Sequence, residues 1–332
     1  MFSIIFNIGS SRSWIDFPVS HVIHNVTLFQ VAHNQSGEKI NMQKTSFKGW
    51  KNCVELNSGD FKIVVTTEIG PRIIGGFVGK SENIFYVDPA SAGKKGGSEW
   101  KLYGGHRLWH SPEAKPRSYC PDNGPVQVKE KKDGIEFTAG VEPTTGIYKS
   151  MTIKPLGKRK FSVSHMLRNE NTWPVELAAW ALSVMAPGGT AVIPVPQGDR
   201  KALLPNCYMT VWPYTDLGDS RLSFGRKLIL LRQDPNAKEA SKIGLNCEDG
   251  WIAYANNGVA LVKRFEHMVD AEYPDNGCSI ESYSCSFMLE IETLGPLYLL
   301  EPGAELVHEE VWEGVTGIGK IDTEKDAAKY FR

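Results

Sequence analysis

Hydrophobic and polar residues alternate in short segments along most of the chain, and turn residues separate these segments. β-Branched and aromatic side chains dominate residues 61–67, 72–78 and 84–87, with Gly70-Pro71 between the first two segments. Short runs of this composition, bounded by Gly, Pro, Asn and Asp, are typical of β-strands. The pattern therefore predicts a series of strands in this part of the chain.

Two dipeptides predict tight hairpins further along the chain. Asp133-Gly134 and Asn257-Gly258 each stand between two segments of strand-like composition. Both dipeptides favour the two-residue turn whose twist matches that of antiparallel strands. Consecutive strands at these positions should therefore pair with each other.

Helical patterns are rare in this sequence. Only residues 237–241 and 323–331 are expected to be helical, and no internal repeat or linker divides the chain. We therefore predict an all-β fold, a large antiparallel β-sandwich formed as a single domain by residues 42–332. Residues 1–41 show no regular period, so we expect a poorly structured leader that can be removed without loss of stability.

Composition excludes several classes of function. The 332 residues include 37 Lys and Arg and 38 Asp and Glu, which give a formal net charge of −1 without the basic excess of a nucleic-acid-binding protein. No apolar run approaches the ~20 residues of a membrane helix. The six cysteines form no C-x-x-C pair, so we expect reduced thiols and a cytoplasmic location. The sequence leaves the oligomeric state open.

Residues 282–292 carry a candidate proton-transfer site. Read as one extended strand, they place Glu290 and Glu292 on a single face because side chains alternate with period 2. Other members of this face would be Ser282, Ser284, Ser286 and Met288. The alternative is an ordinary solvated sheet face that carries two surface carboxylates.

Residues 104–112 form a second candidate, which we expect to be a loop because Gly and Pro bound it. His106 and His110 are potential acids or bases near neutral pH, Arg107 offers a planar fork to oxygen atoms, and Trp109 offers a flat apolar surface. Together they suit a polyhydroxylated ligand. A buried turn with hydrogen-bonded histidines is the alternative. A metal pair is disfavoured because the segment lacks the helical features and the glutamate of that motif.

Four further residues have two plausible roles each. His165 shares a strand face with apolar residues and is expected to be a hydrogen-bonded core histidine, whereas a rim position fits His308 equally well. Lys263 and Asp216 are candidate ligand contacts, and the alternative for both is an ordinary surface charge.

Several segments, in a fixed order, resemble the galactose mutarotase-like (aldose 1-epimerase) superfamily, and more closely a bacterial branch of it. The matching segments are Gly70-Pro-Arg72-Ile-Ile-Gly, Gly104-Gly-His106-Arg107-Leu-Trp109, the stretch 169–187 with Trp173-Pro174, Met185-Ala-Pro-Gly-Gly189, and Glu290-Ile-Glu292-Thr293 followed by Pro302-Gly303. The resemblance covers about residues 50–315. It implies a β-sandwich with a sugar groove across one sheet, a small sugar as the partner, and no metal or organic cofactor.

Enzymes of this superfamily interconvert the anomers of aldoses. A glutamate takes the proton from the C1 hydroxyl while a histidine protonates the ring oxygen. The resemblance assigns the base to Glu292, but the strand that would supply the histidine reads Leu177-Ala-Ala-Trp180. His106 or His110 would then have to be the acid, or the protein binds sugar without catalysis.

The residue patterns and the resemblance together predict the site residues. Glu292 and His106 are expected to be catalytic, and the expected substrate contacts are Arg107, Arg72, Trp109, His110, Asp216 and Lys263. The alternative function is a non-catalytic sugar-binding or sensing protein. A glycoside-processing enzyme would need a second positioned carboxylate, and Glu290 is a poor candidate because it lies only ~6–7 Å along the same strand.

Overall fold

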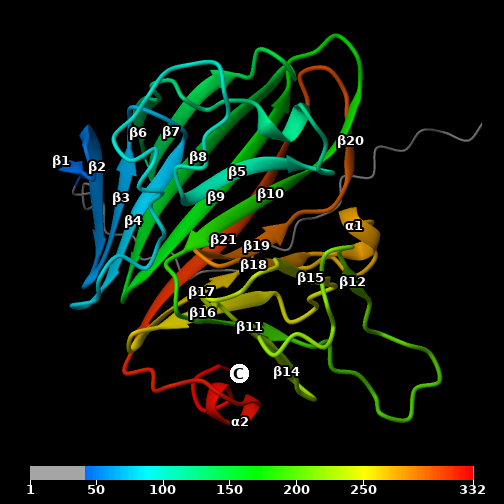
Figure 1. Cartoon of the computed structure of the whole chain (residues 1–332). Helices are drawn as coiled ribbons and strands as arrows, with labels where there is room; N and C mark the ends of the chain where they lie inside the picture. Colours follow the sequence, from blue (N-terminus) through cyan, green and yellow to red (C-terminus); the bar gives the residue numbers. More distant parts are fainter. Residues whose placement is uncertain (1–41, 133, 332) are drawn as a thin grey trace, which may run out of the picture. The chain divides into compact units, whose positions relative to one another are not determined.

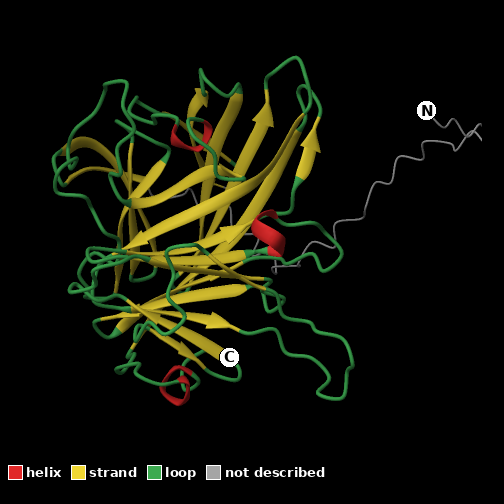
Figure 2. Cartoon of the chain, turned by 45° about the vertical axis from the view of Figure 1, so that its right-hand side comes forward, coloured by secondary structure: helices red, strands yellow, loops and turns green. Residues whose placement is uncertain are grey.

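A computed structural model describes residues 42–132 and 134–331, and nearly all of its regular structure is β-strand (Figure 1, Figure 2). The strands pair antiparallel in two large sheets, which confirms the predicted all-β, antiparallel β-sandwich. The predicted leader and its truncation concern residues 1–41, which lie outside the described residues. In the part that is described, no helix is long and apolar enough to cross a bilayer.

The first sheet has 11 strands and carries most of the candidate residues. In spatial order its strands are β1 (Met42–Phe47), β2 (Trp50–Ser58), β3 (Phe61–Thr66), β4 (Arg72–Val78), β5 (Gly105–Ser111), β10 (Val175–Met185), β19 (Leu289–Leu294), β18 (Ile280–Ser284), β15 (Ser241–Leu245) and β12 (Met209–Val211), and β20 (Tyr298–Leu300) pairs with β10.

The second sheet has 10 strands. In spatial order they are β13 (Leu222–Phe224), β14 (Leu228–Arg232), β11 (Thr190–Pro194), β16 (Trp251–Asn256), β17 (Val259–Arg264), β21 (Glu305–Thr316), β9 (Lys160–Asn169), β8 (Ile147–Gly157), β7 (Gly134–Val141) and β6 (Gln127–Lys131). The helical turns are η1 (Arg117–Tyr119), α1 (Pro274–Gly277) and α2 (Glu324–Ala327).

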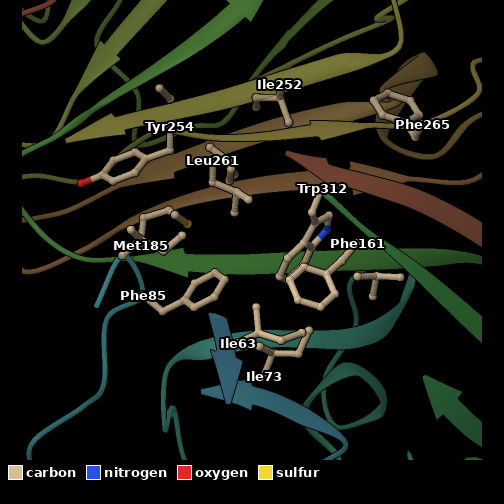
Figure 3. Close-up of a cluster of buried hydrophobic side chains, with 14 of the residues drawn as sticks. Ile63, Ile73, Phe85, Phe161, Met185, Ile252, Tyr254, Leu261, Phe265 and Trp312 are labelled. Atoms are coloured by element: carbon tan, nitrogen blue, oxygen red, sulfur yellow. The ribbon is translucent and has the colours of Figure 1, made fainter. Parts of the chain in front are cut away.

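Apolar side chains of the two sheets meet in one core (Figure 3). The ring of Phe61 on β3 lies edge-on to Phe161 on β9 at 5.2 Å, and Phe85 lies 5.8 Å from Trp312 on β21. Fully burying a side chain of this kind stabilises the fold by about 1.5–3 kcal/mol. The inward positions of both sheets thus supply the apolar contacts that hold the sandwich together.

The predicted hairpins are present in the structure. Asn257 and Gly258 join β16 to β17, and both have positive φ angles, 47° and 83°, as the tight turn requires. At the other site β6 pairs with β7, and Lys131 lies opposite Gly134.

Two of the predicted elements are wrong. Residues 237–241 form no helix, and Ser241 begins β15, whose pairing with β12 and β18 overrides the local helical preference. Residues 84–87 form isolated bridges rather than a strand. The predicted C-terminal helix is reduced to α2, which Thr323 begins with a capping box.

The segment 104–112 is not a loop, because its residues 105–111 form β5, a central strand between β4 and β10. Every residue of β5 is buried, so neither face shows the apolar alternation that usually identifies a strand. Gly104 and Gly105 are needed at its start because a Cβ there would lie 2.1 and 2.3 Å from backbone carbonyl oxygens. The glycines therefore mark close backbone contact rather than a flexible loop.

Candidate functional site

Alternation along β5 separates the predicted site residues onto the two sides of the 11-stranded sheet. His106 and His110 point to the inner face, toward the second sheet, and His106 contacts His165 on β9. Arg107 and Trp109 point to the outer face, where Arg107 contacts Glu290. The prediction that both histidines and Arg107 line one groove is therefore wrong.

On the inner face, His106 belongs to a chain of buried hydrogen bonds. Its Nε2 lies 2.7 Å from His165 Nε2, its Nδ1 lies 2.8 Å from Ser183 Oγ, and His165 Nδ1 lies 3.0 Å from the carbonyl oxygen of His308. A carbonyl only accepts, so His165 carries its proton on Nδ1 and accepts from His106 Nε2–H. Ser183 then donates to His106 Nδ1, and burial holds the pKa of both imidazoles below its usual value.

A buried ion pair continues this network on β17 and β21. Lys263 Nζ lies 2.7 Å from Glu310 Oε1 and donates to the carbonyl of Ala181 at 2.9 Å. Thr293 and Trp312 also donate to Glu310. The described contacts of Lys263 are therefore structural, and its role as a substrate contact remains a prediction.

His308 completes what we call the interior network. Because Thr293 donates its proton to Glu310, its oxygen accepts from His308 Nε2–H, at 2.8 Å. Burial lowers the pKa of His308 to about 3, so the ring is neutral at physiological pH. The members of the interior network are Ser183, His106, His165, His308, Thr293, Glu310, Lys263 and Trp312, and among the described residues none of their buried polar side-chain atoms lacks a partner.

Three members of the interior network could in principle hold a metal ion. Ligand atoms of His106, His165 and Glu310 lie within 4.8 Å of one another, and two imidazoles with a carboxylate suit several transition metals. The imidazoles, however, already bond to each other, and Lys263 neutralises Glu310. The geometry therefore fits a closed hydrogen-bond network better than a cation site.

The outer face gathers carboxylates from a hairpin. Residues 282–292 form β18 and β19 rather than one strand, with Glu281 opposite Glu292 and Ser282 opposite Ile291. Glu290 and Glu292 do share the outer face. Ser282 and Ser284 do not, because the register pairs them with Ile291 and Leu289, which lie on the inner face.

A lysine lies between two of these carboxylates. Lys242 Nζ is 2.6 Å from Glu281 Oε2 and 3.2 Å from Glu292 Oε2, which also accepts from Trp180 Nε1 at 2.7 Å. The ammonium lies 4.8 Å from the ring of Trp180 and 4.6 Å from the ring of Trp212. Lys242 and the N–H of Trp180 thus hold one oxygen of Glu292 in place, and the two rings in turn hold the ammonium of Lys242.

Burial and neighbouring charges shift the pKa values on this face. Burial raises the pKa of Glu290 to about 7, although Arg107 opposes the shift, and burial also raises the pKa of Glu281 well above its usual value. For Lys242, burial is outweighed by Glu281 and Glu292, which raise its pKa. Near neutral pH the lysine is therefore charged, whereas Glu290 is close to its titration midpoint.

Several buried polar atoms on the outer face have no partner within the protein. Arg107 stacks on Trp109 at 4.3 Å and places Nη2 3.5 Å from Glu290, but its Nε and Nη1 are unpartnered, as is Glu292 Oε1. An unsatisfied buried group costs about 1–3 kcal/mol. We call Arg107, Lys242, Glu281, Glu290, Glu292, Trp109 and Trp180 the outer cluster. Its free donors and acceptors are what a polar ligand requires.

No family model matches this sequence, and no curated protein matches it. Solved structures do match. A galactose mutarotase-like protein from Lactobacillus casei has a TM-score of 0.54 and 11% identity, covering 79% of this chain and 100% of its own. A candidate aldose 1-epimerase from Klebsiella pneumoniae has a TM-score of 0.51 and 12% identity, covering 87% of this chain and 85% of its own. The chain has the galactose mutarotase-like fold.

A candidate aldose 1-epimerase from Escherichia coli K12 gives the same result, with a TM-score of 0.50, 12% identity, and coverage of 80% of this chain and 99% of its own. The resemblance found in the sequence motifs is thus confirmed for the fold.

Two predicted contacts lie outside the outer cluster of this mutarotase-like sheet. Arg72 is fully buried and uses its guanidinium to contact Asp122 and the carbonyls of Leu102 and Gly104. Asp216 is exposed and accepts a hydrogen bond from the backbone of Gly218 at 2.8 Å. Their described contacts are therefore structural, and their roles in ligand binding remain predictions.

His110 lies apart from both groups. It is buried on the inner face, and its Nε2 is 3.3 Å from Glu142. Its buried Nδ1 has no partner among the described residues, so its contact with substrate remains a prediction.

Three members of the outer cluster were missed in the sequence. Lys242 directly follows residues 237–241, for which the sequence predicts a helix. Glu281 directly precedes residues 282–292, for which it predicts a single strand. Trp180 could have been predicted as a site residue, because the resemblance already points to its strand as the one that would supply the histidine. Recognising β18 and β19 as a hairpin would have placed Glu281 opposite Glu292.

Proposed function

We propose that the protein binds a small aldose at the outer cluster and interconverts its anomers with Glu292 as the base. The observation that supports this most is the set of buried, unpartnered donors and acceptors on Arg107 and Glu292. These atoms lie on the outer face of a sheet with the galactose mutarotase-like fold. A sugar would supply hydroxyl groups to both residues.

The surroundings of the outer cluster also suit a sugar. The rings of Trp109 and Trp180 lie edge-on to each other with centroids 5.4 Å apart, and the ring of Tyr214 lies 6.3 Å from that of Tyr283. Aromatic rings offer apolar surfaces to the C–H faces of a pyranose, while a few convergent polar groups set its orientation. Both kinds of group occur here on one face.

Glu292 is well placed for the role of base. Its Oε2 is held by Trp180 and Lys242, whereas its Oε1 is free. A base must be oriented within about 2.6–3.2 Å of the proton that it removes. The two donors supply this orientation and leave one oxygen for the C1 hydroxyl.

A second function, sugar binding without catalysis, is favoured by one specific observation. None of the described histidines that the sequence suggested as the acid belongs to the outer cluster, because His106, His110, His165 and His308 are buried elsewhere. A protein that lost its acid on a retained fold would bind sugar but leave the anomers unchanged.

The test is NMR saturation exchange between anomers over a panel of aldoses. For wild type we expect exchange above the spontaneous rate, and for Glu292→Gln a loss of about 10²–10⁴-fold, the usual contribution of a general base. The matched control is Glu309→Gln on the exposed side of β21, which should leave exchange unchanged. Sugar binding without exchange in wild type would establish the second function, and absence of both would contradict the proposal.

A further inference from the structure

We propose that Glu290 is the general acid of this site and protonates the ring oxygen of the sugar in place of a histidine. The inference rests on the proposed anomer exchange and deepens it. It assigns two carboxylates of one strand to the two proton transfers of a single reaction.

The chemistry requires both a base and an acid. Glu292 takes the proton of the C1 hydroxyl, the C1–O5 bond breaks as the C1 carbonyl forms, and Glu290 gives its proton to O5. After rotation about C1–C2, O5 attacks the other face of the carbonyl. Glu290 then recovers the proton from O5 while Glu292 returns its proton to O1. At the end of the cycle both carboxyl groups have regained their starting protonation states, and no electron has been transferred.

The geometry of β19 fits these two roles. Glu290 and Glu292 are two residues apart on one strand, so their backbones lie ~6–7 Å apart along the outer face. O1 and O5 are bonded to the same carbon, and each carboxyl group needs to come within about 2.6–3.2 Å of its oxygen. One pyranose can therefore contact both groups, whereas a mechanism that needs them on opposite sides of the ring cannot use this pair.

The two carboxylates differ in exposure and in partners. The side chain of Glu290 is 10% exposed, whereas those of Glu281 and Glu292 are fully buried. Glu292 has two donors that stabilise its anion, while Glu290 has only the 3.5 Å contact with Arg107. Glu290 is therefore the more exposed of the two carboxyl groups and the one whose charge is less stabilised.

Burial acts on Glu290 in the direction that an acid requires, since it raises the pKa to about 7. A carboxyl group whose pKa is raised toward neutrality is commonly the general acid of its site. The charged and titratable groups that act on or respond to Glu290 are Arg107, Lys242, Glu292, Glu113, Tyr119 and Tyr283.

Other groups on this face hold their protons too firmly. Glu281 and Glu292 raise the pKa of Lys242, and burial raises the pKa of Tyr283. Neither can release a proton readily near neutral pH, where an efficient acid titrates. Glu290 alone among these three residues has a proton to give in that range.

The experiment is a pH profile of anomer exchange for wild type, Glu290→Gln, Glu290→Asp and the control Glu309→Gln. In wild type the exchange rate should fall above about pH 7 as the acid loses its proton. Glu290→Gln should be slower by at least ~10²-fold and lack this alkaline decrease. Glu290→Asp should keep the decrease at a reduced rate, and the control should match wild type.

The possible results separate this inference from the proposed function. Exchange in Glu290→Gln at the wild-type rate, with the alkaline decrease intact, would overturn the role of Glu290 and leave anomer exchange standing. Absence of exchange in wild type would overturn both. If Glu290→Gln does not fold, the wild-type profile decides, because a rate that is constant between about pH 5 and 9 contradicts an acid of this kind.

Discussion

The interior network lies between the two sheets, whereas the outer cluster lies on the outer face of the 11-stranded sheet, and both bury charged side chains. Strands β5, β10 and β19 contribute residues to both groups. In the interior network every buried donor and acceptor has a partner, whereas in the outer cluster Arg107 and Glu292 keep free polar atoms. A fully satisfied network rigidifies a core, and a partly satisfied one must find its partners elsewhere. Degree of hydrogen-bond satisfaction, rather than residue type, therefore distinguishes the structural group from the candidate site.

The charge balance of the two regions differs in the same way. Lys263 and Glu310 form a one-to-one pair, with the surrounding histidines neutral. In the outer cluster three carboxyl groups accompany Arg107 and Lys242. Such crowding favours binding of protons to some of the carboxyl groups. Glu290 in the outer cluster therefore titrates near neutral pH, whereas His308 in the interior network stays neutral there.

The largest effect expected from this contrast is on stability. Lys263→Met should lower the free energy of unfolding by about 3–5 kcal/mol, because it leaves the fully buried Glu310 without its cation. Denaturant unfolding monitored by intrinsic fluorescence measures the change.

The double variant Lys263→Met with Glu310→Leu is the matched control for that experiment. It should be less destabilised than Lys263→Met alone, because removal of both charges leaves no unpaired ion. A single variant as stable as wild type would mean that the interior pair is not essential to the fold.

An intermediate effect is expected for His106→Phe. The substitution removes the partners of His165 Nε2 and Ser183 Oγ, at a cost of about 1–3 kcal/mol in stability. Anomer exchange should be unchanged, because His106 faces away from Glu292. A loss of anomer exchange without a loss of stability would support His106 as the general acid. It would contradict the assignment of a purely structural role to the interior network.

A pair of opposite pH dependences is also expected, each with a slope of at most ~1.4 kcal/mol per pH unit per group. The pKa of His308 falls from 6.5 to about 3 on folding. Its contribution to stability is thus complete above pH 6.5 and is lost as the pH falls toward 3. The pKa of Glu290 rises from 4.5 to about 7, so its contribution is complete below pH 4.5 and is lost as the pH rises through 7.

Unfolding free energies measured across this pH range test both signs. His308→Gln should reduce the slope of the acidic limb of the stability profile and Glu290→Gln that of the alkaline limb, with each variant leaving the other limb as in wild type. Loss of the alkaline limb in His308→Gln would show that the two regions titrate together.

The local pattern of the sequence was sufficient for the fold class and for individual hairpins. Asn257-Gly258 predicted its turn because the required positive φ angles are a property of those two residues. Glu290 and Glu292 share a face because residues two apart in any strand do so. Such relations depend only on residues that are close together in the sequence, so they can be predicted from the sequence alone.

Contacts between distant segments determine which face of each strand in the 11-stranded sheet packs against the second sheet. The sequence of β5 was not recognised as a central strand, because apolar and polar residues need not alternate in a strand that is buried on both sides. Pairing of β18 with β19 places Ser282 opposite Ile291, away from the face of the glutamates, and brings Glu281 opposite Glu292. Tertiary structure thus decided that Arg107 faces the candidate site and His106 the core, because a step of one residue along a strand exchanges its faces.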